Sequence, residues 1–219
     1  MNKELSIRNK IIKTCLLLEQ KKLNQCKSGN VSYRWKNGFL ITPSGMSYNK
    51  INSDDIVYIN DNKIFKGKRK PSIEWQFHYD IFKNIKEVNV IIHNHPAYAT
   101  GLSIVQKNIK PYHYMIAFFG GNDVKCAKFA LPGSKKLSAL VVKSLNNRKA
   151  CLLANHGSII VGSDFDETLI LTEELEALCK QITIAKINGT PKLVSQKNMR
   201  DVLMAIKNYG KQSNFKILF

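Results

Sequence analysis

The run from Val88 to Ile92 (VNVII) is the feature that most constrains how this chain can fold. Its β-branched residues favour a buried strand, because branched side chains pack well on a pleated surface. The segment before it carries Trp75, Phe77 and Phe82 in a helical pattern, and Ser72 can cap that helix. A helix that leads into a buried strand predicts a sheet covered by helices, which is an α/β fold.

The rest of the sequence alternates between the same two patterns. Ile7, Ile11, Cys15 and Leu18 recur at helical spacing and predict a first helix from Glu4 to Leu23. We expect strands at Val31 to Trp35, Phe39 to Thr42, Ile56 to Ile59, Val88 to His93, Met115 to Phe119, Ala150 to Leu153 and Ser158 to Val161. We expect further helices at Lys135 to Asn146, Asp164 to Lys186 and Gln196 to Tyr209. These segments predict mixed α/β layering around a central, mixed and largely antiparallel sheet.

The length of 219 residues and the apolar content of 44% suit one compact core. We therefore predict a single domain over residues 1–210. Residues 211–219 form a basic, apolar tail that we expect to be mobile. The sequence contains no internal repeat.

The charge balance is strongly basic, with 34 Lys and Arg against 16 Asp and Glu and a net charge of +18. Such a charge either meets an anionic partner or is spread over a solvated surface. The basic residues are scattered from Lys3 to Lys216 and are not interleaved with aromatic residues, which a base-stacking surface needs. The pattern favours a diffuse surface charge and no nucleic-acid partner.

The cysteines indicate a reducing compartment. Their number is odd, their spacing is irregular and no Cys-x-x-Cys pair occurs: Cys15, Cys26, Cys126, Cys151 and Cys179. The sequence begins with charged residues and has no apolar run of membrane-spanning length. We therefore expect a cytoplasmic protein with no membrane partner.

Three histidines carry the clearest signal of chemistry. His93 and His95 close the strand that begins at Val88, and residues two apart on a strand point to the same face. A His-x-His pair alone is more often a polar sheet edge than a ligand pair. His156 changes this balance, because it also follows an apolar strand and can complete a three-imidazole zinc site with one open position. The carboxylate of Glu74 could fill that position at rest.

The other two histidines give weaker signals. We interpret His78 as a helix surface or core residue, and His113 has no assigned role.

Six short segments form an ordered set along nearly the whole chain: Gly29 to Ser32, Ile41 to Gly45, Ser72 to Trp75, His93 to His95, His113 to Ala117 and Asn155 to Gly157. In this order they resemble the class II aldolase/adducin family. The resemblance implies a three-layer α/β/α sandwich assembled as a homotetramer, with active sites between subunits. It also implies a metal-dependent aldolase that cleaves a ketose 1-phosphate into dihydroxyacetone phosphate and an aldehyde through a metal-bound enediolate.

The resemblance assigns roles to individual residues. It implies one Zn²⁺ per subunit held by His93, His95 and His156, with Glu74 as the catalytic acid/base and a resting ligand. Tyr114 would reach the site of the adjacent subunit and handle the proton on the C4 oxygen. The implied phosphate and substrate contacts are Gly29, Asn30, Ser44, Gly45 and Ser72, with Tyr209 closing over the site.

Two positions depart from the aldolase pattern. Ile73 stands where the pattern has a second serine, and Pro132 stands where it has an aromatic residue. The first removes a hydroxyl from the expected phosphate cradle, and the second changes the side of the site that shapes the aldehyde.

Other functions remain open at this stage. A pentulose-phosphate 4-epimerase or a methylthiopentulose-phosphate dehydratase would use the same metal-binding residues. A non-catalytic adducin-like scaffold would keep the fold without the metal, and a nucleic-acid binder would use the +18 charge.

Overall fold

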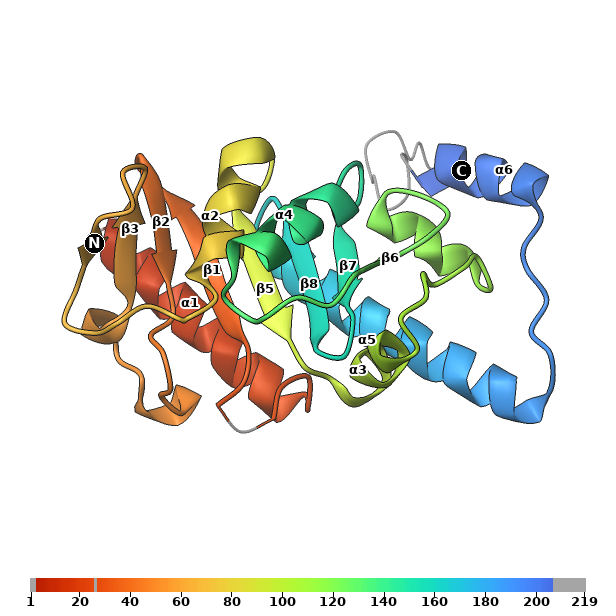
Figure 1. Cartoon of the computed structure of the whole chain (residues 1–219), viewed down its shortest axis with the longest axis horizontal. Helices are drawn as coiled ribbons and strands as arrows, with labels where there is room; N and C mark the ends of the chain where they lie inside the picture. Colours follow the sequence, from red (N-terminus) through yellow and green to blue (C-terminus); the bar gives the residue numbers. More distant parts are fainter. Residues whose placement is uncertain (1–2, 26, 207–219) are drawn as a thin grey trace, which may run out of the picture.

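The computed structural model describes residues 3–25 and 27–206 and contains one eight-stranded sheet (Figure 1). The strand order is β4-β3-β2-β1-β5-β8-β7-β6. The bounds are β1 Asn30–Trp35, β2 Gly38–Ile41, β3 Val57–Asn60, β4 Phe65–Lys66, β5 Val90–Asn94, β6 Lys125–Ala127, β7 Ala150–Leu153 and β8 Gly157–Gly162. All neighbouring strands are antiparallel except β6 and β7, which are parallel. The predicted mixed, largely antiparallel sheet is therefore confirmed.

Helices cover both faces of this sheet (Figure 1). Their bounds are α1 Lys3–Gln20, α2 Trp75–Asn84, α3 Ala97–Ile104, α4 Lys135–Ser144, α5 Phe165–Asn188 and α6 Gln196–Ile206. Strand β5 shows why two covers are needed, because its side chains alternate between cores. Ile91 packs in the core beneath α2 and α4, whereas Val90 and Ile92 pack in the core beneath α1. A third core joins α3, α5 and α6 to the other end of the sheet, which completes a three-layer α/β/α sandwich.

Several predicted element bounds differ from the observed ones by a few residues. The first helix ends at Gln20 instead of Leu23, although Leu23 is buried in the core beneath α1. Glu74, and not Ser72, occupies the N-cap position of α2. Ser72 lies two residues earlier, and its hydroxyl accepts the backbone N–H of Glu74 at 3.3 Å.

One predicted strand is wrong. Residues Tyr114–Phe119 form the 3₁₀ helix η3 instead of a strand. The ring Nδ1 of His113 accepts the Met115 N–H, which caps the start of this helix, and Gly120 ends it with a left-handed φ of 87°. The apolar content of the segment reflects burial of Ile116 and Phe119 against α5 and α6, not strand pairing.

Helix α3 has a sequence with weak helix formers, including Thr100 and Gly101, and was not predicted. Its first turn is stabilised by a residue far along the sequence. The carboxylate of Glu176 on α5 accepts the backbone N–H groups of Tyr98 and Ala99 at 2.9 and 2.8 Å. The short strands β4 and β6 and the 3₁₀ helices η1 Tyr48–Lys50 and η2 Ser53–Asp55 were also not predicted.

The sheet register brings several chain segments to one edge. The start of β1 pairs with the end of β5 at Asn30 and His93, and Ser32 of β1 pairs with Ile41 at the end of β2. The end of β5 pairs in turn with the start of β8 at Asn94 and Ser158. The loops that follow β2, β5 and β7 therefore meet beside the start of β1.

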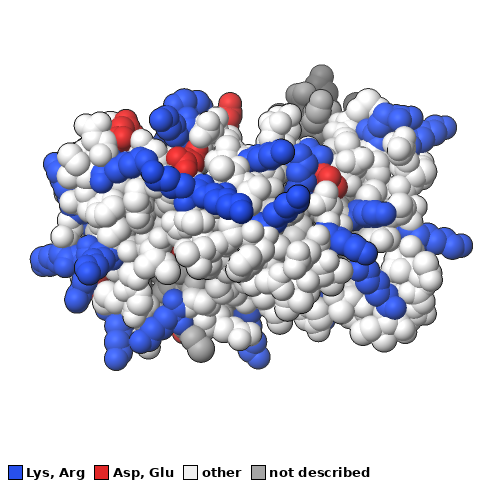
Figure 2. Space-filling view, in the orientation of Figure 1, with Lys and Arg blue, Asp and Glu red and all other residues white. Residues whose placement is uncertain are grey.

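The charged groups on the face shown in Figure 2 are mostly basic. Figure 2 shows Lys and Arg side chains spread from one end of the visible face to the other, with few acidic groups between them. Within the described residues, no helix is both long and apolar enough to cross a bilayer. The predicted domain boundary at residue 210, Tyr209 and the tail 211–219 lie outside the described residues.

Candidate active site

The structure brings together the three histidines that the sequence singled out. His93 is in β5, His95 follows it, and His156 lies in the turn between β7 and β8. Their ring centroids are 4.7, 4.8 and 4.9 Å apart, and one nitrogen from each ring lies within 4.8 Å of the other two. Two separate strand ends therefore deliver three imidazoles to one point.

Neighbouring residues hold the His93 ring and the backbone of His95 in place. The Nδ1–H of His93 donates to the backbone oxygen of Ser158 at 2.9 Å, which directs Nε2 towards the other two rings. The backbone N–H of His95 donates to the Asn24 side chain at 3.0 Å. A Cβ at Gly157 would lie 2.6 Å from the His95 ring and 2.5 Å from the Asn94 oxygen, so only glycine fits beside the rings.

Glu74 faces the histidines from the start of α2. Its Oε2 lies 3.0 Å from Nε2 of His93, and its Oε1 lies 3.4 Å from Nε2 of His156. The Asn30 amide donates to Oε2 at 3.1 Å. Among the described residues, Oε1 is a buried acceptor without a hydrogen-bond partner. A buried carboxylate oxygen that lacks a donor is a natural position for a cation.

The electrostatics keep the carboxylate ionised. Burial raises the pKa of Glu74, but His93, His156 and the Asn30 amide outweigh burial and lower the pKa to about 2. Burial lowers the pKa of His93, but Glu74 and the Ser158 oxygen raise it by more than burial lowers it. The net shift of the His93 pKa is therefore upward. Glu74 and His93 are therefore a buried pair, 3.0 Å apart, in which each side chain favours the charged form of the other.

The other two imidazoles are held neutral. Burial, together with the charge on His93, lowers the pKa of His95 to about 3 and that of His156 to about 4. A neutral imidazole offers a free lone pair, which is the form that binds a metal ion. His93 can join them once it releases its proton, and three imidazole nitrogens with one open position are the donor set of catalytic metal centres, so the residues fit a divalent ion.

The residues expected to bind phosphate lie along the same sheet edge. Asn30 begins β1 and Gly29 precedes it, and the turn that follows β2 carries Ser44 and Gly45. Backbone hydrogen bonds join this turn to the segment before α2. The Ser44 N–H donates to the backbone oxygen of Lys70 at 3.0 Å, and the Ser72 N–H donates to the backbone oxygen of Thr42 at 3.0 Å. A Cβ at Gly29 would lie 2.6 Å from the His93 backbone oxygen, which explains a glycine there. The Asn30 amide donates to the Glu74 carboxylate and the Ser72 hydroxyl accepts the Glu74 backbone N–H, so both residues adjoin Glu74.

The two departures from the aldolase pattern are neighbours in space. Ile73 precedes Glu74 and is 67% exposed. Gly133, which follows Pro132, approaches so closely that a Cβ there would lie 2.7 Å from the Ile73 oxygen. The segment that carries Pro132 therefore lies against Ile73, next to Glu74.

Tyr114 is not part of this constellation within its own chain. It starts η3, is 52% exposed, and stacks on the ring of His113 at a centroid distance of 4.8 Å. Helix η3 packs with α5 and α6, at the other end of the sheet from α1 and α2. Tyr209 lies outside the described residues.

Sequence reasoning missed the residues that support the site. The residues that bond to the segments carrying His93 and His95 are all buried: Asn24, Asn94 and Ser158. Ser32 is also buried and bonds to the ring of His78. His78 is likewise fully buried, so of the two predicted positions, helix surface or core, it lies in the core. Its position four residues after Glu74 was a usable signal, because residues four apart share one face of a helix.

Comparison with known proteins agrees with this arrangement. Residues 9–183 match the family described as Class II Aldolase and Adducin N-terminal domain. The chain is 40% identical over 202 residues to L-fuculose phosphate aldolase of Haemophilus influenzae, covering 92% of this chain and 94% of the relative. It is 37% identical over 188 residues to 5-methylthioribulose-1-phosphate/5-deoxyribulose-1-phosphate aldolase of Rhodospirillum rubrum, covering 86% and 85%.

A solved structure shows the same likeness in three dimensions. The structure titled L-fuculose 1-phosphate aldolase superimposes with a TM-score of 0.89 at 31% identity, and the match covers 94% of this chain and 98% of that one. The family match spans most of the chain, and the aldolase relatives cover nearly all of it. The chain belongs to the class II aldolase and adducin family, as a lyase of the class II aldolase type.

Proposed function

We propose that this aldolase cleaves a ketose 1-phosphate between C3 and C4 and yields dihydroxyacetone phosphate and an aldehyde. The supporting observation is the convergence of His93, His95 and His156 beside Glu74, whose Oε1 has no donor among the described residues. The relatives named for L-fuculose phosphate and for methylthioribulose phosphate both support a ketose 1-phosphate, with L-fuculose 1-phosphate first.

We propose zinc as the metal, one ion per subunit, bound by His93, His95 and His156. The ion supplies Lewis-acid stabilisation of the negative charge that develops on the substrate oxygens as the carbon–carbon bond breaks. Three imidazoles with an open position are the usual donor set for catalytic zinc.

Glu74 has the part of proton carrier at C3. In the condensation direction its ionised carboxylate accepts a proton from C3, which agrees with its pKa of about 2 in the metal-free site. In the cleavage direction the same carboxyl group returns a proton to C3. The Asn30 amide, which donates to Oε2 at 3.1 Å, orients the carboxylate in both directions.

Tyr114 supports a homotetramer with shared active sites. Its ring is half exposed and stacks on His113, and the helix η3 that it begins packs with α5 and α6. We propose that Tyr114 enters the site of a neighbouring subunit and exchanges the proton of the C4 oxygen. Tyr209 is proposed to close over the same site.

The phosphate is proposed to lie against Gly29, Asn30, Ser44, Gly45 and Ser72. These positions share one sheet edge and two of them adjoin Glu74. We further propose that residues 1–210 act as one catalytic domain and that the protein works in the cytoplasm, where phosphorylated sugars are found.

A coupled assay for dihydroxyacetone phosphate tests the function. The substrates are L-fuculose 1-phosphate, 5-methylthioribulose 1-phosphate and 5-deoxyribulose 1-phosphate, each with and without a chelator. We expect turnover of at least one substrate, loss of turnover with the chelator and recovery with Zn²⁺. Release of dihydroxyacetone phosphate that resists a chelator would refute the metal-dependent mechanism.

Two controls separate the competing functions. L-ribulose 5-phosphate, assayed for xylulose 5-phosphate, detects an epimerase. Metal analysis of the purified protein is expected to give about one zinc per chain, whereas a non-catalytic scaffold would bind none.

A further inference from the structure

A buried series of side-chain hydrogen bonds leads away from Glu74 into the core. The Asn30 amide group contacts Glu74 through Nδ2 and contacts Nε2 of His78 through Oδ1. The other ring nitrogen of His78, Nδ1, lies 2.7 Å from the Ser32 hydroxyl. Glu74 is 6% exposed, Asn30 is 2% exposed, and His78 and Ser32 are fully buried.

Two periodicities place these four side chains. Glu74 and His78 are four residues apart at the start of α2 and therefore share a helix face. Asn30 and Ser32 are two residues apart on β1 and therefore share a sheet face. The series alternates between the helix and the strand, so it couples the position of the catalytic acid to the packing of α2 on the sheet.

Chemistry fixes the direction of every bond in the series. The Oδ1 of Asn30 can only accept, so His78 donates from Nε2. His78 is neutral, because burial and the charge on His93 lower its pKa to about 3, so its Nδ1 carries no proton and accepts from Ser32. If the Asn30 amide were turned over, its oxygen would face the Glu74 carboxylate, and two acceptors would oppose each other. Only one orientation of Asn30 satisfies both neighbours.

Packing holds the His78 ring in place independently of these bonds. The ring stacks on Phe77 at a centroid distance of 4.7 Å and on Phe39 at 6.5 Å. The Nε2–H of His78 is therefore a donor whose position is fixed by apolar packing.

We propose that His78 is a positioning residue for catalysis: it sets the Asn30 amide so that the amide donates to Glu74 and holds the carboxylate towards the substrate carbon. This proposal rests on the proposed function of Glu74. His78 itself does not touch the substrate. Loss of its Nε2–H lets the Asn30 amide rotate, so the cost falls on the chemical step more than on substrate binding.

A pair of substitutions separates the donor from the ring shape. His78→Phe keeps a planar ring between Phe39 and Phe77 but removes both hydrogen bonds. His78→Gln keeps an N–H at the place of Nε2. We expect kcat to fall about 10- to 100-fold in His78→Phe with KM changed less than about threefold, and most of this loss to be recovered in His78→Gln. Equal kcat in His78→Phe and wild type would overturn the proposal, as would equal losses in the two variants.

A second measurement tests the proposal without turnover. Nitrogen NMR of the metal-free protein labelled at histidine reports which ring nitrogen carries the proton. We expect His78 as the neutral Nε2–H form throughout pH 5 to 8, and we expect this form to persist in Ser32→Ala, because the Asn30 oxygen still accepts from Nε2–H. A proton on Nδ1 in the wild type would overturn the proposal even if His78→Phe did not fold.

The two proposals fail in different ways. If Glu74→Gln keeps full activity, the proposed function of Glu74 is wrong, and so is the positioning of Glu74 by His78. If Glu74→Gln is inactive but His78→Phe is fully active, the function stands and only the role of His78 is refuted.

Discussion

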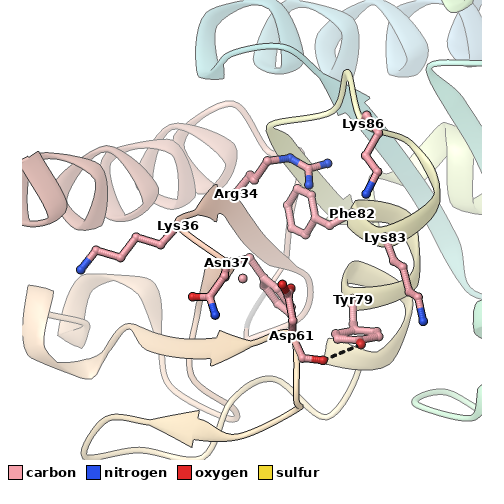
Figure 3. A pocket seen from close by; sticks show the side chains of 10 residues that line it. Arg34, Lys36, Asn37, Asp61, Tyr79, Phe82, Lys83 and Lys86 are labelled. Atoms are coloured by element: carbon pink, nitrogen blue, oxygen red, sulfur yellow. Dashed lines mark hydrogen bonds between the residues drawn. The ribbon is translucent and has the colours of Figure 1, made fainter.

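Two regions of this molecule gather polar side chains, and they differ in how those side chains are paired. The first is the histidine site at the ends of β5 and β7. The second is a hollow of about 400 Å³ beside β1 and α2, which we call the basic hollow (Figure 3). Its charged lining residues are Arg34, Lys36, Asp61, Lys83 and Lys86.

The lysines of the basic hollow are not paired with acidic groups in the part of the chain that the structure describes. Among the described residues, none of its three lysines has a carboxylate within ion-pair distance. Arg34 is the ordered cation there, but its guanidinium donates to the backbone oxygens of Val88 and Ile85 at 2.8 and 2.9 Å and stacks on Phe82. Arg34 therefore fastens the end of α2 to the sheet.

The histidine site shows the opposite condition. Glu74, Asn30 and His93 are buried there, and among the described residues of the site Oε1 of Glu74 is the buried side-chain atom without a hydrogen-bond partner. A buried acceptor without a donor costs free energy unless a ligand satisfies it. The comparison teaches that a single unsatisfied buried atom indicates function better than several exposed charges do.

The largest effect should come from removing an imidazole. We expect His95→Ala to lower kcat/KM by about 10³-fold or more, because two remaining imidazoles hold a divalent ion poorly. Turnover and bound zinc should fall together, while the thermal midpoint of the metal-free protein changes little. Normal zinc content with lost turnover would contradict a ligand role for His95.

The next effect concerns Glu74. We expect Glu74→Gln to lower kcat by about 10²- to 10⁴-fold, because an amide cannot carry the proton at C3. Exchange of the C3 proton of dihydroxyacetone phosphate in D₂O isolates this step from aldehyde binding. Zinc content serves as the control and should be retained. Unchanged exchange in the variant would remove Glu74 from the proton transfer.

Elements that depend on local sequence could be predicted, and elements that depend on distant residues could not. The sheet, α2 and the three histidines could be predicted because local periodicity and strand ends fix them, as in the run that ends at His93. Helix α3 could not, because its first turn depends on Glu176, which lies far along the chain. Segment 114–119 has an apolar composition that suits a strand, but the His113 cap and Gly120 make it a 3₁₀ helix.

The supporting residues were hidden for a related reason. Asn24 and Ser158 act through contacts with residues more than 60 positions away, and their identities alone suggest only turns or polar strand residues. Spacing reveals which residues share a face, but not which polar atom a distant backbone group will meet.

A smaller, structural effect is expected at Gly157. A Cβ there would lie 2.5 Å from the Asn94 oxygen, so Gly157→Ala must displace the loop that carries His156. We expect the free energy of unfolding to fall by about 1–3 kcal/mol in urea titrations. Gly101→Ala is the matched control, because nothing lies within 4 Å of that Cβ in α3. It should stabilise by about 0.5–1 kcal/mol. Equal effects of the two changes would show that the loop tolerates the methyl group.

The metal-free protein should lose stability in acid. The pKa of His78 is lowered from 6.5 to about 3 and those of His95 and His156 are also lowered, so the unfolded chain binds more protons below pH 6.5. The raised pKa of His93 acts oppositely, since its contribution is present below pH 6.5 and is lost as the pH rises through its folded pKa. The lowered pKa of Glu74 contributes stability above pH 4.5 that is lost below it.

Three lowered histidines outweigh one raised one in this balance. We expect the free energy of unfolding to fall by roughly 1–3 kcal/mol between pH 6.5 and 5. Urea titrations of chelated protein measure this fall, and His78→Phe should make it shallower because one titrating group is removed. A stability that rises towards pH 5 would mean that the raised pKa of His93 dominates.

The smallest effect is expected in the basic hollow. Lys83→Gln and Lys86→Gln remove two of its cations and leave Arg34 and its two backbone partners in place. Because these lysines make no ion pair among the described residues and lie away from the histidines, we expect kcat to be unchanged and kcat/KM to change less than about twofold in 0.15 M salt. At low salt a modest fall in kcat/KM is expected, since the positive field attracts a phosphorylated substrate. A large loss at 0.15 M salt would show that this hollow belongs to the functional surface, and exposed charge would then be as informative as the unsatisfied Glu74 oxygen.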